Sequence, residues 1–202
     1  MNPDTRKRLT AIHRASFATH GYKPDTLFWS TRGIQKTRFR VLTDIGIACG
    51  DSLLDVGCGF ADLAGFIHGA GTVIDYTGID LSPEILAQGQ QLNPNLNLLC
   101  GDLFDFNFAD QSFDWVMLSG TLNWQLHDKG GYERRALTQM FRLCRKGVAF
   151  NMLDARKIDP KLLGDLIAHE PLQMLHFCQS IAPDSSLRDD YLDNDFTIYM
   201  RS

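Results

Sequence analysis

The chain has 202 residues, of which 44% are hydrophobic and 22% are charged, and its formal net charge at pH 7 is −4. A chain of this length can bury a sizeable core without disulfides or metal ions, and its composition excludes collagen, disulfide-rich miniproteins and mostly disordered chains. The charge is unevenly spread: residues 1–40 contain 9 Lys/Arg and 2 Asp/Glu, whereas residues 41–202 contain 11 and 22. A basic segment therefore precedes an acidic one.

Five cysteines are spread along the chain, at positions 49, 58, 100, 144 and 178. Their odd number and the lack of any Cys-x-x-Cys spacing argue against a disulfide framework and a zinc site. We therefore expect reduced thiols, no metal and a cytoplasmic location. The basic start of the chain precedes too short an apolar run for a secretory signal, and no run approaches the ~18 apolar residues of a membrane span. No membrane association is expected.

The first 50 residues have a helical pattern. Apolar residues recur at helical spacing over residues 5–20 and again from Thr31, a candidate N-cap, to about residue 48. The stretch between them, residues 21–30, contains Pro24 and is predicted to be a connection. We expect these helices to form an N-terminal cap, residues 1–50, on a Rossmann-like core, residues 51–202, within one domain.

From residue 52 onward, short apolar runs alternate with helical patterns. This alternation predicts βαβ units, and so an α/β fold with a doubly wound, mostly parallel sheet. The expected strands cover residues 53–56, 73–80, 96–100, 113–118 and 147–153, and the expected helices cover 61–69, a segment opened by Ser82-Pro83-Glu84, 131–144 and 160–181. Two last strands, 187–192 and 196–200, are separated by only three residues. A gap this short permits a hairpin, so one of these strands should run antiparallel.

The first strand of the core runs into a glycine-rich turn. Gly57 and Gly59 would let the backbone turn sharply and let a ligand lie against it. Open α/β sheets bind ligands at this place, beside the carboxyl ends of the strands. Asp80 closes the next strand, 25 residues after Asp55. An acidic side chain there can accept hydrogen bonds from both hydroxyls of a ribose.

Two nucleoside cofactors suit this arrangement. NAD usually accompanies Gly-x-Gly-x-x-Gly, but Asp62 stands at the third glycine position, where a carboxylate is unfavourable beside a pyrophosphate. S-adenosylmethionine has no phosphate and carries a cationic sulfonium and ammonium, so carboxylates such as Asp55 are acceptable. After the third strand, Asp102 can accept from an adenine amino group and Leu103 can cover the ring. The residues favour S-adenosylmethionine.

These motifs together make the chain resemble the class I, seven-stranded S-adenosylmethionine-dependent methyltransferases. The resemblance covers about residues 50–155 and rests on residues 54–59, 78–84, 101–103 and 113–119, which occur in the family's order and at its spacing. It implies a sheet order of 3-2-1-4-5-7-6 with strand seven antiparallel. It also implies cofactor-binding roles for Trp29, Arg38, Asp55, Gly57, Cys58, Gly59, Asp80, Leu81, Asp102, Leu103 and Ser119. Arg38 would then pair with the methionine carboxylate, and Trp29 would lie over the methionine end.

The chain departs from the family pattern in two places. Many members have Pro-Gly-Gly before strand five, where this chain has Arg145-Lys146-Gly147. No Asp-Pro-Pro-Tyr or Asn-Pro-Pro-Tyr follows strand four, where Ser119-Gly120-Thr121-Leu122 stands instead. The second departure argues against amino-methylation of DNA bases and of the protein glutamines that use this motif.

The catalytic residues of a methyltransferase leave little trace in a sequence, because the enzyme mainly supplies alignment and water exclusion. A hydroxyl or thiol acceptor also has to lose a proton. His127, after the fourth strand, is the candidate base, with a surface histidine as the alternative reading. Trp124 either walls the pocket or packs. The other five histidines, at positions 13, 20, 68, 169 and 176, are expected to be structural or exposed because none has a partner at metal-ligand spacing.

We expect a methyltransferase that acts on a small metabolite, and an anionic one if Arg32 and Lys36 of the cap draw the acceptor's charge. One alternative is an RNA or protein methyltransferase that uses the basic N-terminal arm. Nucleic acid is disfavoured because the arm lacks interleaved aromatic residues for base stacking. A further alternative is an NAD-dependent oxidoreductase or a non-catalytic nucleotide-binding module. The sequence leaves the acceptor atom and the oligomeric state open.

Overall fold

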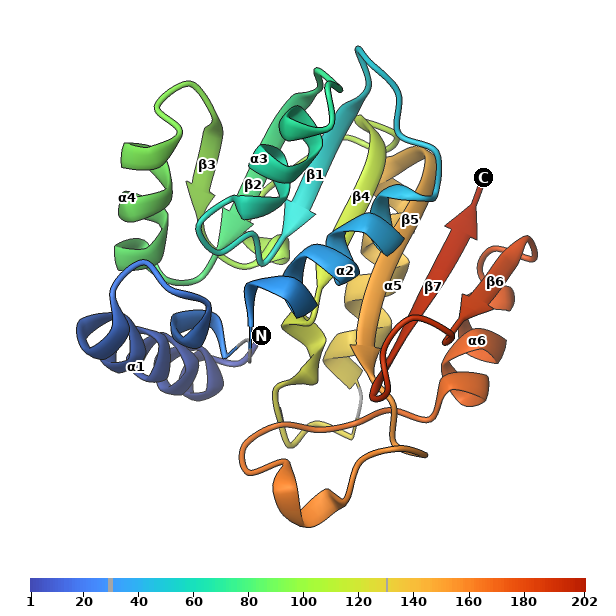
Figure 1. Ribbon diagram of the computed structural model, residues 1–202. Coiled ribbons are helices and arrows are strands. Elements are labelled where there is room, and N and C mark those ends of the chain that lie inside the picture. The colour runs from blue at the N-terminus through green and yellow to red at the C-terminus, as the bar shows by residue number, and fades with distance from the viewer. Residues whose placement is uncertain (29–30, 130) are drawn as a thin grey trace.

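The computed structural model describes residues 1–28, 31–129 and 131–202. Within these residues seven strands form one sheet, in the order β3-β2-β1-β4-β5-β7-β6 (Figure 1). Strands β1 to β5 pair in parallel, and β7 runs antiparallel to both β5 and β6. The strands are β1 Ser52–Val56, β2 Asp75–Asp80, β3 Asn97–Cys100, β4 Phe113–Ser119, β5 Cys144–Leu153, β6 Ser185–Arg188 and β7 Asp195–Arg201. The expected fold class and strand order are confirmed.

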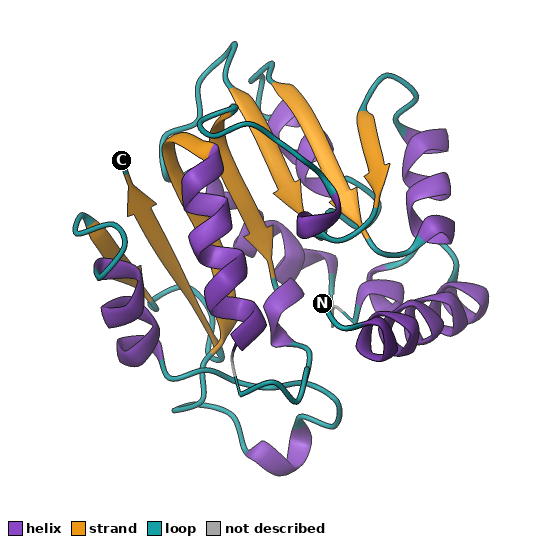
Figure 2. Ribbon diagram, turned by 180° about the vertical axis from the view of Figure 1, so that it is seen from behind, coloured by secondary structure: helices purple, strands orange, loops and turns teal. Residues whose placement is uncertain are grey.

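Helices cover both faces of the sheet. Helices α2 and α3 pack on one face and α5 and α6 on the other, as the two opposite views show (Figures 1 and 2). The helices are α1 Pro3–His20, α2 Arg32–Thr43, α3 Asp62–Gly69, α4 Pro83–Leu92, α5 Gly131–Leu143 and α6 Pro171–Gln179, with 3₁₀ turns η1 Pro24–Leu27, η2 Leu103–Asp105, η3 Thr121–Asn123 and η4 Pro160–Leu162. Thr31 caps α2 as expected, since its Oγ1 accepts a hydrogen bond from Ile34 N at 3.2 Å. Helix α1 lies against α4, below the carboxyl ends of β3 and β2 (Figure 1).

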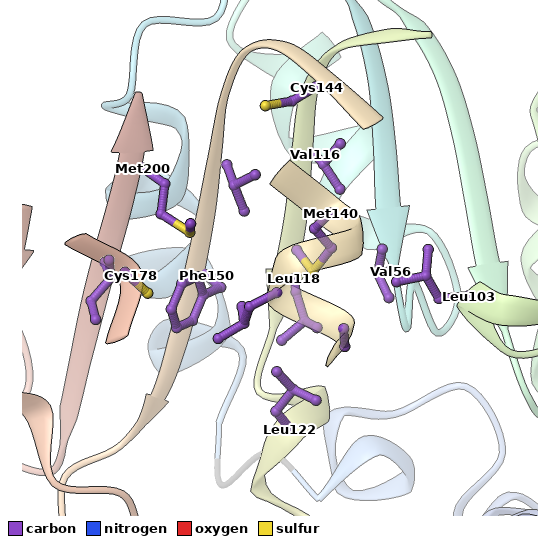
Figure 3. Close-up of a cluster of buried hydrophobic side chains, with 14 of the residues drawn as sticks. Val56, Leu103, Val116, Leu118, Leu122, Met140, Cys144, Phe150, Cys178 and Met200 are labelled. Carbon is purple, nitrogen blue, oxygen red and sulfur yellow. The ribbon is translucent and has the colours of Figure 1, made fainter. Parts of the chain in front are cut away.

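The core has two halves because alternate residues of a strand point to opposite faces. In β4, Val116 and Leu118 join the cluster under α5 and α6, whereas Trp115 and Met117 join the cluster under α2 and α3. Figure 3 shows the first cluster, in which Phe150 of β5 lies with these side chains between the sheet and the helices. Burial on both faces is typical of parallel strands, and it explains the continuous apolar run in β4.

The expected helix over residues 160–181 is wrong in its first half. Residues 160–162 form only the turn η4, and α6 begins at Pro171. Gly164 has a φ of +56°, which ends any helix there. Glu170, before Pro171, has the extended backbone that a following proline imposes. The segment between η4 and α6 is therefore a loop, and it crosses the carboxyl-terminal end of β5 through a bridge between Asp154 and His169.

Other expected boundaries shift by a few residues. Helix α2 ends at Thr43 instead of about residue 48, and Gly46 then turns with a φ of +116°. Strand β2 begins at Asp75 instead of residue 73, and β5 begins at Cys144 instead of residue 147. Strand β6 covers 185–188 instead of 187–192. These shifts leave the order and direction of the strands unchanged.

The basic cap folds onto the acidic core. Five cap arginines form ion pairs with core carboxylates: Arg6 with Asp105 (2.6 Å), Arg8 with Asp165 (3.6 Å), Arg14 with Glu84 (2.5 Å), Arg32 with Asp62 (3.2 Å) and Arg38 with Asp195. Opposite charges therefore meet across the contact between residues 1–40 and the rest of the chain. This arrangement is the structural counterpart of the uneven charge in the sequence.

Two observations concern membranes and metals. Across the described parts of the chain, every helix is too short or too polar to cross a membrane. Among the same residues, no group of three or more His, Cys, Asp or Glu side chains could hold a metal ion.

Candidate active site

A cavity lies at the carboxyl ends of β1, β2 and β4. It encloses about 1270 Å³, counted with its opening to solvent. From the core, its wall includes Asp55, Gly57, Cys58, Asp80, Leu81, Asp102, Leu103 and Ser119. From the cap, it includes Leu9, His13, Leu27, Phe28, Gln35 and Arg38. The structure thus brings the expected cofactor-binding residues together around the cavity, except that Gly59 is not part of its wall and Trp29 lies outside the described residues.

The turn after β1 requires glycine at two positions. Gly57 and Gly59 have φ angles of +74° and +55°, which L side chains rarely adopt. A Cβ atom at Gly57 would lie 2.0 Å from Thr121 Oγ1, and one at Gly59 would lie 2.7 Å from Leu27 Cδ1. The backbone of the turn is therefore packed closely against η3 on one side and the cap on the other.

Asp80 is held between two loops at the end of β2. Its Oδ2 accepts a hydrogen bond from Gly59 N at 3.0 Å, and its Oδ1 accepts one from Ser82 N at 2.9 Å. Each carboxylate oxygen has lone pairs beyond these bonds. The half-buried carboxylate is thus fixed in place with capacity to accept further hydrogen bonds from a ligand.

Asp55 lies deeper, in the middle of the sheet. It is buried, and its Oδ2 accepts a hydrogen bond from Tyr76 Oη at 2.6 Å. Burial raises the pKa of Asp55 to about 7, with a smaller contribution from the charges of Asp80 and Asp62. A cationic group in the cavity would favour the ionised form of Asp55.

Asp102 and Leu103 follow β3 and start the turn η2. The Oδ1 atom of Asp102 accepts a hydrogen bond from Phe104 N at 3.0 Å. Its Oδ2 atom lies 3.2 Å from the amino nitrogen of Met1, which also lines the cavity. The Oδ2 atom forms no hydrogen bond with the described residues, so its lone pairs remain available to a ligand. Leu103 is buried beside it.

Cys58 and Ser119 line the cavity, and neither side chain is activated as a nucleophile. Burial raises the pKa of the Cys58 thiol well above its ordinary value, so the thiol stays protonated. A Cβ atom at Gly78 would lie 2.7 Å from its Sγ, so Cys58 fills tightly packed space. Ser119 Oγ donates a hydrogen bond to Asn151 Oδ1 at 3.3 Å. Both residues act here as small side chains at strand ends.

Arg38 has a carboxylate partner that the sequence did not reveal. Its Nε and Nη2 atoms both donate to the carboxylate of Asp195, and both side chains are buried. Arg38 lines the cavity at the same time. The sequence placed Asp195 in a hairpin turn, and the pairing appears only when α2 packs beside the start of β7.

His127 was the expected base and His13 was expected to be structural or exposed, but the structure places His13, and not His127, at the cavity. His127 is exposed, has a φ of +57° and does not line the cavity. His13 lines the cavity from α1. Sequence reasoning missed it, although one signal was available: His13 lies four residues after buried Leu9, and residues at this spacing share a helix face. Trp124 also lines the cavity, so its reading as a pocket wall is supported.

Comparisons with known proteins identify a methyltransferase. A family model described as a methyltransferase domain matches residues 53–147. A Mycobacterium tuberculosis protein whose name describes it as a methyltransferase is 27% identical over 158 residues, which are 74% of this chain and 92% of that protein. The demethylmenaquinone methyltransferase of Staphylococcus aureus strain JH9 is 34% identical over 114 residues. That match covers 54% of this chain and 45% of the enzyme, so the chain spans about half the length of this relative.

Solved structures share the fold at low sequence identity. A SAM-dependent methyltransferase from Archaeoglobus fulgidus has a TM-score of 0.68 at 12% identity, over 85% of this chain and 95% of that one. A phosphoethanolamine N-methyltransferase from Haemonchus contortus, in complex with S-adenosylhomocysteine, has a TM-score of 0.67 at 13% identity, over 94% and 60%. The expectation of S-adenosylmethionine as the cofactor is confirmed at the level of the family. Residues 53–147 thus match a methyltransferase domain, and the seven-stranded sheet around them has the α/β fold of the class I S-adenosylmethionine-dependent methyltransferases.

Proposed function

We propose that this protein transfers the methyl group of S-adenosylmethionine to a small-molecule acceptor held between the core and the cap. The observation that carries the proposal is the set of three carboxylates, Asp55, Asp80 and Asp102, at the ends of neighbouring strands around one cavity. Such a wall suits a cofactor with cationic groups and no phosphate, because carboxylates would repel a pyrophosphate. The match to a methyltransferase domain supports the same choice over NAD.

Each wall residue has a role in this proposal. Asp80 accepts hydrogen bonds from the ribose hydroxyls, and Asp102 accepts one from the adenine amino group, with Leu103 against the ring. The backbone at Gly57 and Gly59 gives the cofactor close approach to the sheet. Further cavity contacts come from Cys58, Leu81 and Ser119. The bound cofactor supplies a methyl group on a sulfonium leaving group.

Arg38 keeps its proposed role near the methionine end in a modified form. Its guanidinium already contacts Asp195 through two nitrogen atoms, so Asp195 fixes its orientation. The same side chain lines the cavity, so the guanidinium lies where the cofactor would bind. We infer that Asp195 positions Arg38, and that Arg38 contacts the cofactor carboxylate.

A small acceptor is supported by the cap side of the cavity. Leu9, Phe28, Trp124, Leu126 and Leu166 give it an apolar and aromatic wall, which is typical of small-molecule sites. The name of the S. aureus relative, demethylmenaquinone methyltransferase, also points to an acceptor that is not a macromolecule.

The expected anionic charge of the acceptor gains no support from Arg32 and Lys36. Both line a second hollow, next to α3, and Arg32 pairs with Asp62 there. The alternative of an RNA or protein methyltransferase loses support for a similar reason, because five arginines of the basic arm contact carboxylates of the core.

The proposal also covers the domain organisation of the chain and the place of the protein in the cell. We propose that residues 1–50 and 51–202 form one domain, since Leu42 of α2 and Ile45 just after it are buried in the cluster that contains Leu53 and Met117. A cytoplasmic location is supported by the five cysteines, which are all free thiols.

Transfer of a tritiated methyl group from S-adenosylmethionine into a cell extract, fractionated by size, tests the proposed function. We expect the label in the small-molecule fraction, and we expect Asp80→Ala to abolish it. Label that moves into RNA or protein would contradict the small acceptor. NAD released from the purified protein on denaturation, identified by its mass, would contradict the methyltransferase itself.

A further inference from the structure

His13 stands in an aromatic cluster at the cap side of the cavity, which we define as His13, Phe28 and Trp124. The ring centroids lie 5.6 Å apart for His13 and Phe28, 5.4 Å for His13 and Trp124, and 5.1 Å for Phe28 and Trp124, and all three pairs meet edge to face. The three residues come from α1, from the end of η1 and from the loop after η3. The cluster therefore exists only when the cap lies on the core.

The position of the cluster is fixed from both sides. Trp124 forms a bridge with Leu166 in the loop before α6. Arg8, five residues before His13 on α1, donates to the carbonyl oxygen of Gln125 and pairs with Asp165. Phe28 is 46% exposed, although its ring packs on both partners. Phe28 also lines the cavity, so the exposed part of its ring is available there to a ligand.

The imidazole of His13 lacks a hydrogen bond that buried histidines usually have. Its Nδ1 atom is buried, and the described part of the chain offers it no hydrogen-bond partner. Most buried polar atoms in proteins are paired, so one without a partner in a cavity calls for an explanation. His169 shows the contrast: its Nε2 lies 3.1 Å from Leu122 O, and its Nδ1 lies 3.3 Å from Glu133 Oε2.

The charge state of His13 suits a proton acceptor. Burial lowers the pKa of His13 below its ordinary value, and the carboxylate of Asp80 opposes this shift. The other charged groups around the same cavity include Arg38, Asp55, Asp102 and the amino group of Met1. A neutral imidazole at pH 7 has one nitrogen with a free lone pair, which can take a proton from a ligand.

We propose that the aromatic cluster is the acceptor subsite, that the acceptor is an aromatic compound with a hydroxyl group, and that His13 is the base that takes the hydroxyl proton. This proposal rests on the proposed function and deepens it. Aromatic side chains and the neighbouring leucines favour a flat, apolar ring. A carboxylate acceptor would need no base, and burying its charge in an apolar wall would be costly.

The reaction step balances within these groups. The O–H bond of the acceptor breaks, and its proton forms an N–H bond with the imidazole of His13. The oxygen lone pair forms a bond with the methyl carbon, while the bond from that carbon to sulfur breaks and its electron pair stays on sulfur. The products are an aryl methyl ether, S-adenosylhomocysteine and a protonated His13, which then loses its proton to water.

Two phenols of different acidity test the role of His13 directly. Phenol is protonated at pH 8, whereas 4-nitrophenol is largely ionised and needs no base. For His13→Gln we expect kcat with phenol to fall about 100-fold, KM to change little, and kcat with 4-nitrophenol to stay within a few-fold of the wild type. The wild-type kcat with phenol should rise with pH through the His13 pKa, and this step should disappear in the variant. Imidazole in the buffer should restore part of the activity of His13→Ala.

Controls separate this inference from the proposed function. His20→Gln changes an exposed histidine on the same helix and should leave both reactions unchanged. If kcat of His13→Gln fell equally with phenol and with 4-nitrophenol, the role of His13 as the base would be overturned. Transfer to 2-naphthoate and not to 2-naphthol would overturn the acceptor class. In either case, S-adenosylmethionine binding by the wild-type protein would leave the proposed function standing. A wild-type protein that does not bind S-adenosylmethionine would overturn both the proposed function and the role of His13.

Discussion

Arg38 on α2 and Asp195 at the first position of β7 form a buried, two-point ion pair across 157 residues of sequence. The pair joins the cap to the sheet beside the cavity, because Arg38 lines that cavity. Asp195 is fully buried, and it pairs with Leu153 at the carboxyl end of β5. The last strand therefore contributes a charge to the site although its apolar residues belong to the core.

Removal of Asp195 tests this contact. We expect Asp195→Ala to lower the free energy of unfolding by about 3–5 kcal/mol, because it removes the carboxylate that a buried guanidinium contacts. Urea unfolding would measure the loss. Asp193→Ala is the matched control, since Asp193 is exposed in the same connection and should change stability by less than about 0.5 kcal/mol. Equal small effects in both variants would contradict a structural role for the pair.

The raised pKa of Asp55 predicts a pH dependence of stability. In the folded protein this pKa is about 7, whereas the unfolded carboxyl has a pKa of about 4. Between these values the folded state holds the proton and the unfolded state has lost it, so the free energy of unfolding falls as pH rises. The fall attributable to Asp55 should be about 2–4 kcal/mol.

Asp55→Asn should remove that fall and so stabilise the protein at pH 8 more than at pH 5. Urea unfolding at the two pH values would show it. Asp75→Asn, at an exposed position of the neighbouring strand, should leave the pH dependence unchanged. A pH dependence that is the same in wild type and Asp55→Asn would show that Asp55 is ionised in the folded protein.

Substitution by alanine should have opposite effects on stability at Gly57, in the turn after β1, and at Gly65, in α3. Gly57→Ala should lower stability by roughly 1–3 kcal/mol, because its φ is positive and its Cβ would collide with Thr121. It should also weaken binding of S-adenosylmethionine. Gly65→Ala lies in α3 with open space around its Cβ and should raise stability by up to about 1 kcal/mol. Thermal unfolding and calorimetry would compare the variants, and normal cofactor affinity in Gly57→Ala would contradict the proposed role of the turn.

The ionic contacts of the cap predict a salt effect. Arg6 and Arg14 on α1 pair with Asp105 and Glu84 at partly exposed sites, where salt screens the attraction. Amide hydrogen exchange in α1 should therefore speed up when NaCl is raised to about 1 M, while exchange in β4 stays slow.

Two substitutions control for the salt effect. Arg14→Gln should speed exchange in α1 already at low salt. Arg142→Gln, which removes a pair with Asp110 away from the cap, should not. Exchange in α1 that ignores both salt and Arg14→Gln would show that apolar packing alone holds the cap.

The sequence predicts the sheet well because its signals are local. Apolar runs such as residues 115–118 reveal buried parallel strands, and the turn at Gly57 marks the edge that binds ligands. The short gap before β7 reveals the antiparallel hairpin. The loop between η4 and α6 was missed because the apolar residues of this segment suggested a helix, although Gly164 and Pro171 interrupt it.

The sequence predicts only those site residues that lie at the ends of strands. Asp80 and Asp102 follow strands, so the fold class fixes their place. His13 and the partner of Arg38 depend on how the cap folds over the sheet. The spacing of Leu9 and His13 marks a shared helix face, but it does not reveal what that face contacts. His127 looked favourable because it follows β4, yet its loop extends into solvent. Contacts between distant segments are therefore what the structure adds.

Calorimetric titration of S-adenosylmethionine into the purified protein measures directly whether the carboxylate-lined cavity binds this cofactor. We predict one binding site in the wild type, with affinity reduced at least about 10-fold in Asp80→Ala, and no heat of binding for NAD. Binding of NAD in place of S-adenosylmethionine, or S-adenosylmethionine binding that is unchanged in Asp80→Ala, would contradict the account.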